Sequence, residues 1–327
     1  MANKGEKMSV SQFTLGNLLG RGAYATVVHG ILKSSQQEYA LKVVEKCYVL
    51  KHRKIHFVHA ERKALHTIGS HPFILRLFFT FQDDRRLYFA LELCHTDLNK
   101  YIQCQYSQRI ETQPLNKGSI LSEETVKIFT AQIFCALMYI HSQRIIHRDV
   151  KCENILISPS GVLKLGDFGT ALFLDDEDGV IESDGGFVGT AEYVSPEVLS
   201  NQAIDSGACD LWALGCIVYK MIQGATPFFQ EAEFLIYQAI KSHISGTGQQ
   251  IIFESCLFDS PTEAFIRGLL DHDVTRRLNG PGFSIQEGED EALKREMNCG
   301  GCWIQHHPFF NGLSWDDLSY EKPSMKA

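Results

Sequence analysis

The hydrophobic pattern of the sequence changes its period near residue 95. Before that point, short β-branched and aromatic runs alternate with polar turns, which predicts strands over residues 26–31, 39–44, 75–81 and 87–92. One helix is predicted among them, over residues 57–68. Beyond residue 95 the apolar spacing becomes helical, and helices are predicted over residues 125–142, 205–223, 233–241 and 261–270. The pattern predicts an α+β chain with a small β-rich lobe that carries one helix and a larger, mainly helical lobe.

Composition limits the classes of protein to which the chain can belong. With 327 residues, of which 44% are hydrophobic and 21% charged, it has the profile of a globular protein with two sizeable cores. Its net charge of -8 argues against binding to nucleic acid or directly to a membrane surface. Residues 1–9 do not have the apolar core of a signal peptide, and no stretch approaches the ~20 uninterrupted apolar residues of a membrane helix. We expect a cytoplasmic protein whose ten cysteines are reduced.

Two polar stretches, residues 107–122 and 279–301, interrupt the helical part and are interpreted as solvated surface insertions. Near the second stretch, Cys299, Cys302, His306 and His307 form a C-x-x-C-x-x-x-H-H string that could ligate zinc. Its spacing is tighter than that of zinc fingers, so a loop followed by a helix end is the favoured interpretation.

A glycine-rich string, G-R-G-A-Y-A, occupies residues 20–25. The residues after it are β-branched, so the string joins two strands and does not open a helix as in a dinucleotide-binding fold. Such a turn brings backbone N–H groups close to a phosphate, although an ordinary hairpin fits the string equally well. No phosphate-loop lysine motif is present.

Four further motifs follow the glycine string in a fixed order. Lys42 lies on a predicted strand, and Glu61 lies on the helix that comes next. An H-R-D-V-K-C-E-N string occupies residues 147–154, D-F-G occupies residues 167–169, and S-P-E occupies residues 195–197. Each motif alone has an ordinary structural explanation, but their joint and ordered occurrence is highly specific.

On these motifs the chain resembles a eukaryotic protein kinase over residues 13–310. The resemblance implies a bilobal kinase fold, with a small lobe at residues 13–95 and a large lobe at residues 96–310. An N-terminal extension at residues 1–12 and a tail at residues 311–327 would flank the lobes, with no pleckstrin-homology domain. It also implies ATP and Mg²⁺ as substrate and cofactor.

The resemblance assigns a role to each motif residue. Asp149 would orient the substrate hydroxyl, Lys151 would lie near the transferred phosphoryl group, and Lys42, held by Glu61, would grip the α- and β-phosphates. Asn154 and Asp167 would ligate the metal. The other implied ATP contacts are Leu19, Gly20, Gly22, Val27, Ala40, Leu91, Glu92, Cys94, Asp97, Leu156 and Thr170. The family pattern also pairs Glu197 with Arg277 and uses Asp210 to brace the catalytic loop.

Three strings, at residues 77–88, 187–199 and 206–217, resemble the 3-phosphoinositide-dependent protein kinases of the AGC group. These enzymes phosphorylate activation loops of other AGC kinases and dock the hydrophobic tail motif of their substrates in a pocket beside the regulatory helix. The matching positions here are Lys46, Val49, Leu50, Ile55, Val58, Arg62, Thr80, Gln82 and Leu87. A helix packed on a sheet would explain the aliphatic residues but not the polar ones around them.

The activation segment departs from the family pattern. Gly186 stands where the family has a phosphorylated serine, with Ser183 and Asp184 just before it and Thr190 after it. Glycine cannot carry a phosphate, so Arg148, which binds that phosphate in the family, would need another partner. Two alternatives remain open: an AGC kinase with different substrates, and a catalytically inactive kinase that acts as a scaffold, against which the intact motif residues argue.

Overall fold

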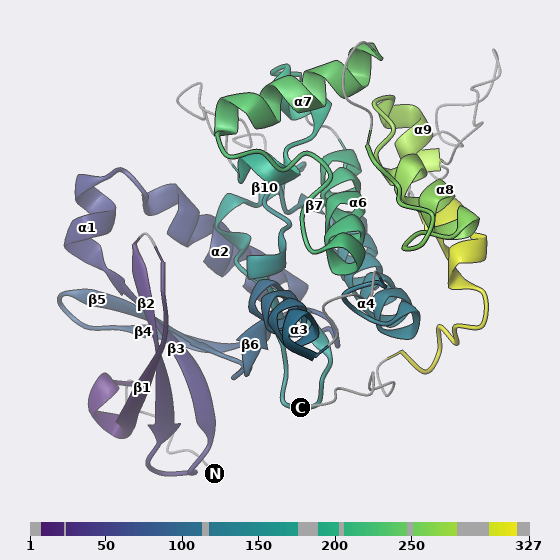
Figure 1. Ribbon diagram of the computed structural model, residues 1–327. Coiled ribbons are helices and arrows are strands. Elements are labelled where there is room, and N and C mark those ends of the chain that lie inside the picture. The colour runs from purple at the N-terminus through teal and green to yellow at the C-terminus, as the bar shows by residue number, and fades with distance from the viewer. Residues whose placement is uncertain are drawn as a thin grey trace.

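The computed structural model describes residues 8–22, 24–112, 118–175, 189–202, 206–246, 251–279 and 301–318. The chain forms a sheet-based small lobe, followed by a larger lobe built mainly of helices (Figure 1). This is the predicted bilobal α+β architecture. Most buried side chains belong to one hydrophobic cluster that contains residues of both lobes.

The small lobe is an antiparallel five-stranded sheet with the order β1-β2-β3-β5-β4. Its strands are β1 (Phe13–Arg21), β2 (Ala25–Leu32), β3 (Glu38–Glu45), β4 (Leu77–Gln82) and β5 (Arg86–Leu91). The central strand β3 is buried at Leu41, Lys42 and Val44, so both of its faces are covered. On one face a second, smaller cluster of aromatic residues forms around Phe13 and Tyr39.

Two helices, and not one, pack beside this sheet. The predicted helix is α2 (Ile55–Ile68), and a short helix that the sequence did not indicate, α1 (Lys46–Lys51), precedes it. The prediction of a single helix was therefore wrong. The helix α1 has six residues, of which only Val49 is buried, and too short a helix leaves no periodic pattern to recognise.

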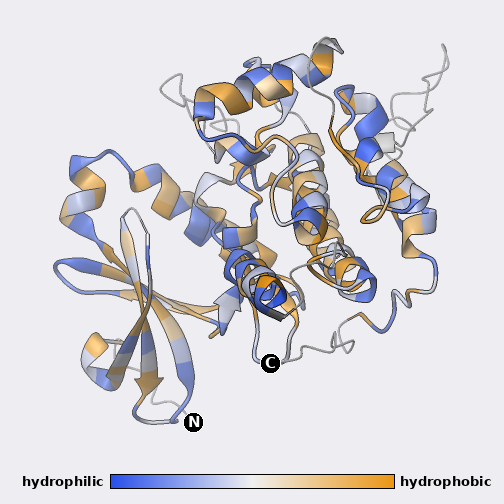
Figure 2. Ribbon diagram, viewed as in Figure 1, coloured by the Kyte–Doolittle hydropathy of each residue, from blue (hydrophilic) through white to orange (hydrophobic). Residues whose placement is uncertain are grey.

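The large lobe is organised around two buried helices, α4 (Glu123–Ser142) and α6 (Ala208–Gln223). The side chain of Ser122 caps α4 by accepting the N–H of Thr125, and acidic residues follow in the first turn. Figure 2 shows that apolar residues make up much of both helices. The surrounding helices are α3 (Leu98–Thr112), α5 (Pro196–Leu199), α7 (Glu233–Ser245), α8 (Ser260–Leu269), α9 (Val274–Asn279) and α11 (Gly301–Gln305).

Short strands and 3₁₀ turns carry the motifs between α4 and α5. Strands β6 (Thr96–Asp97), β8 (Ile155–Ile157) and β9 (Leu163–Leu165) form one small sheet, and β7 (Ile145–Ile146) pairs with β10 (Leu172–Phe173). The 3₁₀ turns are η2 (Cys152–Asn154), η3 (Phe168–Thr170) and η4 (Ala191–Tyr193), and η1 (Val10–Gln12) and η5 (Pro308–Phe310) lie near the ends. The catalytic strings thus lie on short segments fixed at both ends by strand pairing.

The two polar stretches have different outcomes. Residues 107–112 are not a loop, because α3 continues through them to Thr112, and the side chains of residues 107–111 are largely exposed. Residues 113–117 and 280–300, including Cys299, lie outside the described residues. Within the described part of the chain, no three metal-ligating side chains gather, and no helix is long and apolar enough to cross a membrane.

Candidate active site

A cavity of about 560 Å³ lies between the two lobes. This volume is in the range of small-molecule sites. Strands β1, β2 and β3 form its wall on the small lobe, and β6, η2 and β8 form its wall on the large lobe. Predicted residues that line it are Leu19, Gly20, Gly22, Val27, Ala40, Lys42, Glu61, Leu91, Glu92, Cys94, Asp97, Leu156, Lys151, Asn154 and Asp167.

The segment after β5 provides the adenine edge of the cavity. Among the described residues, neither the Glu92 carbonyl nor the Cys94 N–H has a hydrogen-bond partner, and both residues line the cavity. Val27, Ala40 and Leu156 supply apolar walls around them. An acceptor and a donor two residues apart between apolar walls match the edge of an adenine ring.

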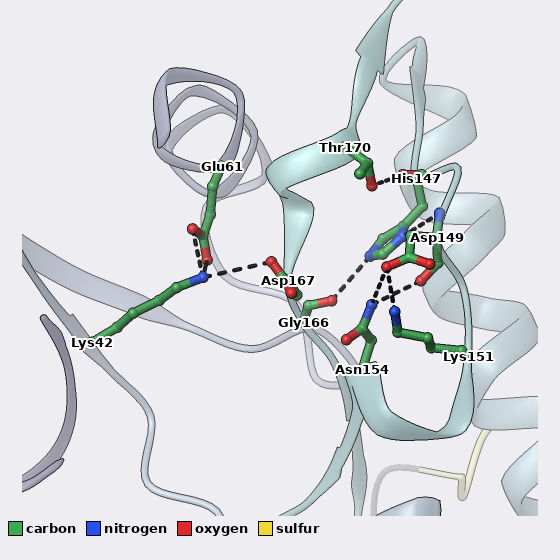
Figure 3. Close-up of polar contacts among 9 residues, drawn as sticks. All are labelled: Lys42, Glu61, His147, Asp149, Lys151, Asn154, Gly166, Asp167 and Thr170. Atoms are coloured by element: carbon green, nitrogen blue, oxygen red, sulfur yellow. Dashed lines mark hydrogen bonds and ion pairs between the residues drawn. The ribbon is translucent and has the colours of Figure 1, made fainter. Parts of the chain in front are cut away.

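Lys42 is held at the inner end of the cavity by two carboxylates. Its Nζ donates to Glu61 Oε1 at 2.6 Å and Oε2 at 2.7 Å, and lies 3.5 Å from Asp167 Oδ1 (Figure 3). Burial alone would lower the pKa of Lys42, but the two carboxylates outweigh it and raise the pKa, so the ammonium stays charged. A fixed ammonium at this position is suited to bind phosphate oxygens.

Asp149 lies at the centre of a second group of side chains. Lys151 Nζ donates to Asp149 Oδ2 at 2.7 Å and to Thr190 Oγ1 at 2.8 Å, and the Thr190 hydroxyl donates to Asp149 Oδ1 at 3.3 Å. Asn154 Nδ2 donates to the same carboxylate at 3.1 Å and to the Asp149 carbonyl at 2.8 Å. These bonds orient a carboxylate that can accept a proton or a hydroxyl hydrogen bond.

Asn154 and Asp167 have the donor set for a divalent metal. Because the Asn154 amide nitrogen donates to Asp149, its amide oxygen remains available as a ligand (Figure 3). Lys42 lowers the pKa of Asp167, so this carboxylate is ionised. Both side chains line the cavity, and amide and carboxylate oxygens are the ligands that hard divalent cations prefer.

Asp210, buried at the start of α6, fixes the loop that carries Asp149. Its carboxylate accepts the backbone N–H groups of His147 and Arg148, both at 2.9 Å, and lies 2.8 Å from His141 Nε2. Arg148 has a φ of 66°, an unfavourable value for a residue other than glycine. The two accepted N–H bonds hold this conformation and therefore the position of the next residue, Asp149.

Two further contacts support the catalytic framework, and the first is the implied pair of Glu197 with Arg277. Arg277 is fully buried and binds Glu197 through two parallel hydrogen bonds of 2.7 and 3.1 Å. His147 and Phe168 are buried with ring centroids 4.8 Å apart, and His147 Nε2 lies 3.0 Å from the Gly166 carbonyl. Phe168 therefore points into the core, which turns the adjacent Asp167 towards Lys42.

Thr170 is not where the resemblance placed it. It is absent from the cavity wall, and its hydroxyl donates to the His147 carbonyl at 2.9 Å while its own carbonyl accepts Arg148 Nε at 2.7 Å. It fixes the catalytic loop to the D-F-G segment. Of the predicted activation segment, Arg148 and Thr190 are described, whereas Ser183, Asp184 and Gly186 lie outside the described residues.

Sequence reasoning missed Tyr24, in the glycine-rich turn. Its ring stacks on Phe57 of α2 with centroids 6.4 Å apart and lies 5.8 Å from Lys42 Nζ. Burial raises the pKa of Tyr24 to about 12, so its hydroxyl stays protonated. No spacing rule links Tyr24 to Phe57. The only indication in the sequence was the presence of an aromatic residue in the glycine-rich turn.

Comparison with known proteins agrees with this geometry. The model of the protein kinase domain matches residues 13–287. The chain is 35% identical over 324 residues to human 3-phosphoinositide-dependent protein kinase 1, covering 97% of this chain and 50% of that protein. Its identity to the Arabidopsis thaliana protein of the same name is 36% over 329 residues, covering 98% and 60%.

A third relative is the serine/threonine-protein kinase ksg1 of Schizosaccharomyces pombe, 34% identical over 326 residues, with 96% of this chain and 48% of that protein covered. The chain thus spans about half the length of these relatives. With the geometry of Lys42, Asp149 and Asp167 in place, the chain belongs to the protein kinase family and is similar to the 3-phosphoinositide-dependent serine/threonine kinases of the AGC type.

Proposed function

We propose that this kinase transfers the γ-phosphoryl group of ATP to serine or threonine in the activation loops of AGC kinases, with Mg²⁺ as its metal. In this proposal Lys42 binds the α- and β-phosphates, and Asp149 accepts the hydrogen bond of the substrate hydroxyl and orients its oxygen towards the γ-phosphorus. Mg²⁺ held by Asn154 and Asp167 would neutralise phosphate charge. Lys151, bound to Asp149, adds a positive charge beside the transferred group.

The substrate class is inferred from a surface on the small lobe, here called the docking surface. It consists of Lys46, Val49, Leu50, Ile55, Val58, Arg62, Thr80, Gln82 and Leu87. Val49 and Val58 are buried in one hydrophobic cluster, against which Leu87 packs, while Leu50 and Ile55 are exposed by 62% and 42%. Exposed aliphatic side chains above an apolar floor are suited to bind the aromatic rings of a peptide.

Polar side chains border this apolar floor. Gln82 pairs with Leu87 across β4 and β5, and Arg62 lies one helical turn after Val58. Both are exposed, and Arg62 can pair with a phosphate or carboxylate of the bound peptide. This combination of an apolar floor with bordering donors is the observation that carries the proposal.

The docking surface is also linked to the active site. Arg62 directly follows Glu61 on α2, and Glu61 makes both hydrogen bonds to Lys42. A peptide that stabilises α2 in this position therefore stabilises the Lys42–Glu61 pair. We expect a coupling free energy of ~1 to 3 kcal/mol between the two sites, which would appear as higher activity when the docking surface is occupied.

The test is a phosphotransfer assay on an activation-loop peptide with and without a carboxyl-terminal aromatic hydrophobic motif. We expect the extended peptide to be the better substrate for the wild type, and Leu87→Glu to remove the difference without changing transfer to the short peptide. Ile252→Glu, at a 58% exposed apolar residue of the large lobe, is the control. Equal use of both peptides by the wild type would refute tail docking.

A further inference from the structure

The segment formed by α1, the following turn and the first part of α2 carries an unusual concentration of positive charge. Residues 46–63 contain six lysines or arginines and one acidic residue, in a chain whose net charge is -8. The acidic residue, Glu61, is buried and bound to Lys42, so it does not neutralise the surface. The six cations are Lys46, Lys51, Arg53, Lys54, Arg62 and Lys63.

Three of these cations, Lys51, Arg53 and Lys54, form together with His52 a run of four consecutive basic residues that we call the turn cluster. Lys51, His52 and Arg53 are exposed, and Lys54 extends over the ring of Phe57 with its Nζ 4.5 Å from the ring centroid. The cluster lies at the outer edge of the small lobe, where Figure 2 shows a hydrophilic turn between the two helices.

The backbone of this turn makes an arginine an unexpected choice at position 53. The N–H of Arg53 donates to the Leu50 carbonyl, and the N–H of Lys54 donates to the Val49 carbonyl, which together form the usual closing pattern of a helix end. Arg53 therefore has a left-handed φ of 52°, at the position where glycine is most favourable. The sequence has a cation at a position where the backbone would favour glycine.

The turn cluster directly adjoins the docking surface. Leu50 and Ile55, its two exposed aliphatic residues, are the immediate sequence neighbours of Lys51 and Lys54. A peptide bound over these aliphatic side chains therefore continues past the turn cluster at one of its ends. Lys46 and Arg62 belong to the docking surface itself, so the turn cluster adds cations beyond it.

We propose that the turn cluster is a second anion-binding site, which recognises acidic or phosphorylated residues next to the aromatic motif of the docked tail. This inference rests on the docking proposal and narrows its substrate class to tails with a negatively charged flank. Each exposed ion pair changes a dissociation constant by up to about fivefold, so the cluster tunes selection among tails and does not replace the aromatic contacts.

An acidic peptide fits the turn cluster better than an anionic membrane does. At physiological salt, charges further away than about 8 Å are largely screened, so a short peptide responds mainly to the local positive field. A membrane faces a much wider area of a chain whose net charge is -8. In addition, the nearby Tyr48 ring packs at a tilted angle against His52, with centroids 4.2 Å apart, and is not presented alone for insertion into lipid.

The test uses Arg53→Gly, which removes one cation from the cluster while giving the turn its most favourable residue. We expect this variant to keep or raise the melting temperature, because glycine adopts the left-handed conformation without strain. The matched control is Gln36→Gly, in the exposed turn between β2 and β3, where Gln36 has a φ of 57°. It relieves the same backbone conformation without changing charge.

Calorimetry measures binding of a neutral aromatic-motif peptide and of the same peptide with glutamates added at either end. We expect the wild type and Gln36→Gly to prefer one acidic peptide by about threefold to tenfold at low salt, and Arg53→Gly to lose about half or more of that preference. Binding of the neutral peptide should be the same in all three proteins.

Each other outcome has a definite meaning. Binding of the neutral peptide without any acidic preference overturns the turn-cluster site and leaves docking intact. Binding of the acidic peptide alone overturns the proposal, because the cluster would then act without measurable docking of the aromatic motif, and no binding of either peptide overturns both proposals. If Arg53→Gly weakens binding to phosphatidylserine vesicles but not to peptides, the cluster is a membrane contact and the proposal is wrong.

Discussion

Replacing Asp210 by asparagine tests whether the buried carboxylate positions the catalytic loop. Asp210 accepts two backbone N–H groups, one through each carboxylate oxygen, and is 1% exposed. Asparagine keeps one acceptor oxygen, but its NH₂ group faces the other N–H and cannot accept it. One backbone donor of the loop then loses a charge-assisted bond inside the protein.

The size of the effect follows from that loss. A charge-assisted hydrogen bond and the desolvation of the donor left behind together amount to about 2 to 4 kcal/mol. If the strained Arg148 conformation relaxes, the loss falls on the position of Asp149, and kcat falls by roughly 30- to 1,000-fold. Asp210 does not line the cavity, so the KM for ATP should change by less than about threefold.

The assay combines urea unfolding with steady-state phosphotransfer at varied ATP concentration. Asp175→Asn is the control, because it makes the same substitution at a carboxylate that accepts one hydrogen bond, from Arg144 Nε at 3.0 Å, on an exposed surface. The control should lose less than about 1 kcal/mol of stability and keep its kcat. If Asp210→Asn behaves like Asp175→Asn, the carboxylate does not position the loop and our reasoning is wrong.

The remaining predictions concern the phosphate-binding residues and the activation segment. Lys42→Met and Asp167→Asn should each abolish transfer while the melting temperature stays within a few degrees of wild type, and near-normal transfer by either would contradict its role. Tyr24→Ala should lower kcat/KM for ATP by about twofold to tenfold through loss of the Phe57 stack, whereas Tyr24→Phe should be close to wild type, as steady-state kinetics can show. Because position 186 is glycine, activity should survive both phosphatase treatment and the substitution Ser183→Ala. If both instead abolish activity, phosphorylated Ser183 supplies the negative charge that pairs with Arg148.

The motifs were predictable from sequence because each combines a residue type with a fixed position in the chain. Such strings predicted the ion pair of Lys42 with Glu61 and the ion pair of Glu197 with Arg277. They also predicted Asn154 and Asp167 as metal ligands. Strand and helix periods likewise placed the sheet and the long helices, since long amphipathic elements give the strongest signal.

What the sequence did not indicate depends on contacts between distant or short segments. The helix α1 has one buried residue and no side-chain cap, so neither periodicity nor capping revealed it. The family resemblance implied an ATP contact for Thr170, but the turn η3 directs its hydroxyl to the His147 carbonyl. The Tyr24–Phe57 stack depends on how the glycine-rich turn folds over α2, which is a tertiary contact.

The most direct test of the central assignment is phosphotransfer from γ-labelled ATP to a mixed protein substrate, followed by phosphoamino-acid analysis. The wild type should label serine and threonine but not tyrosine, and Asp149→Asn should reduce the label by at least about a hundredfold at saturating ATP. Its ATP affinity should remain within about threefold of wild type, because Asp149 does not line the cavity. Label on tyrosine, or undiminished transfer by Asp149→Asn, would contradict a serine/threonine kinase centred on Asp149.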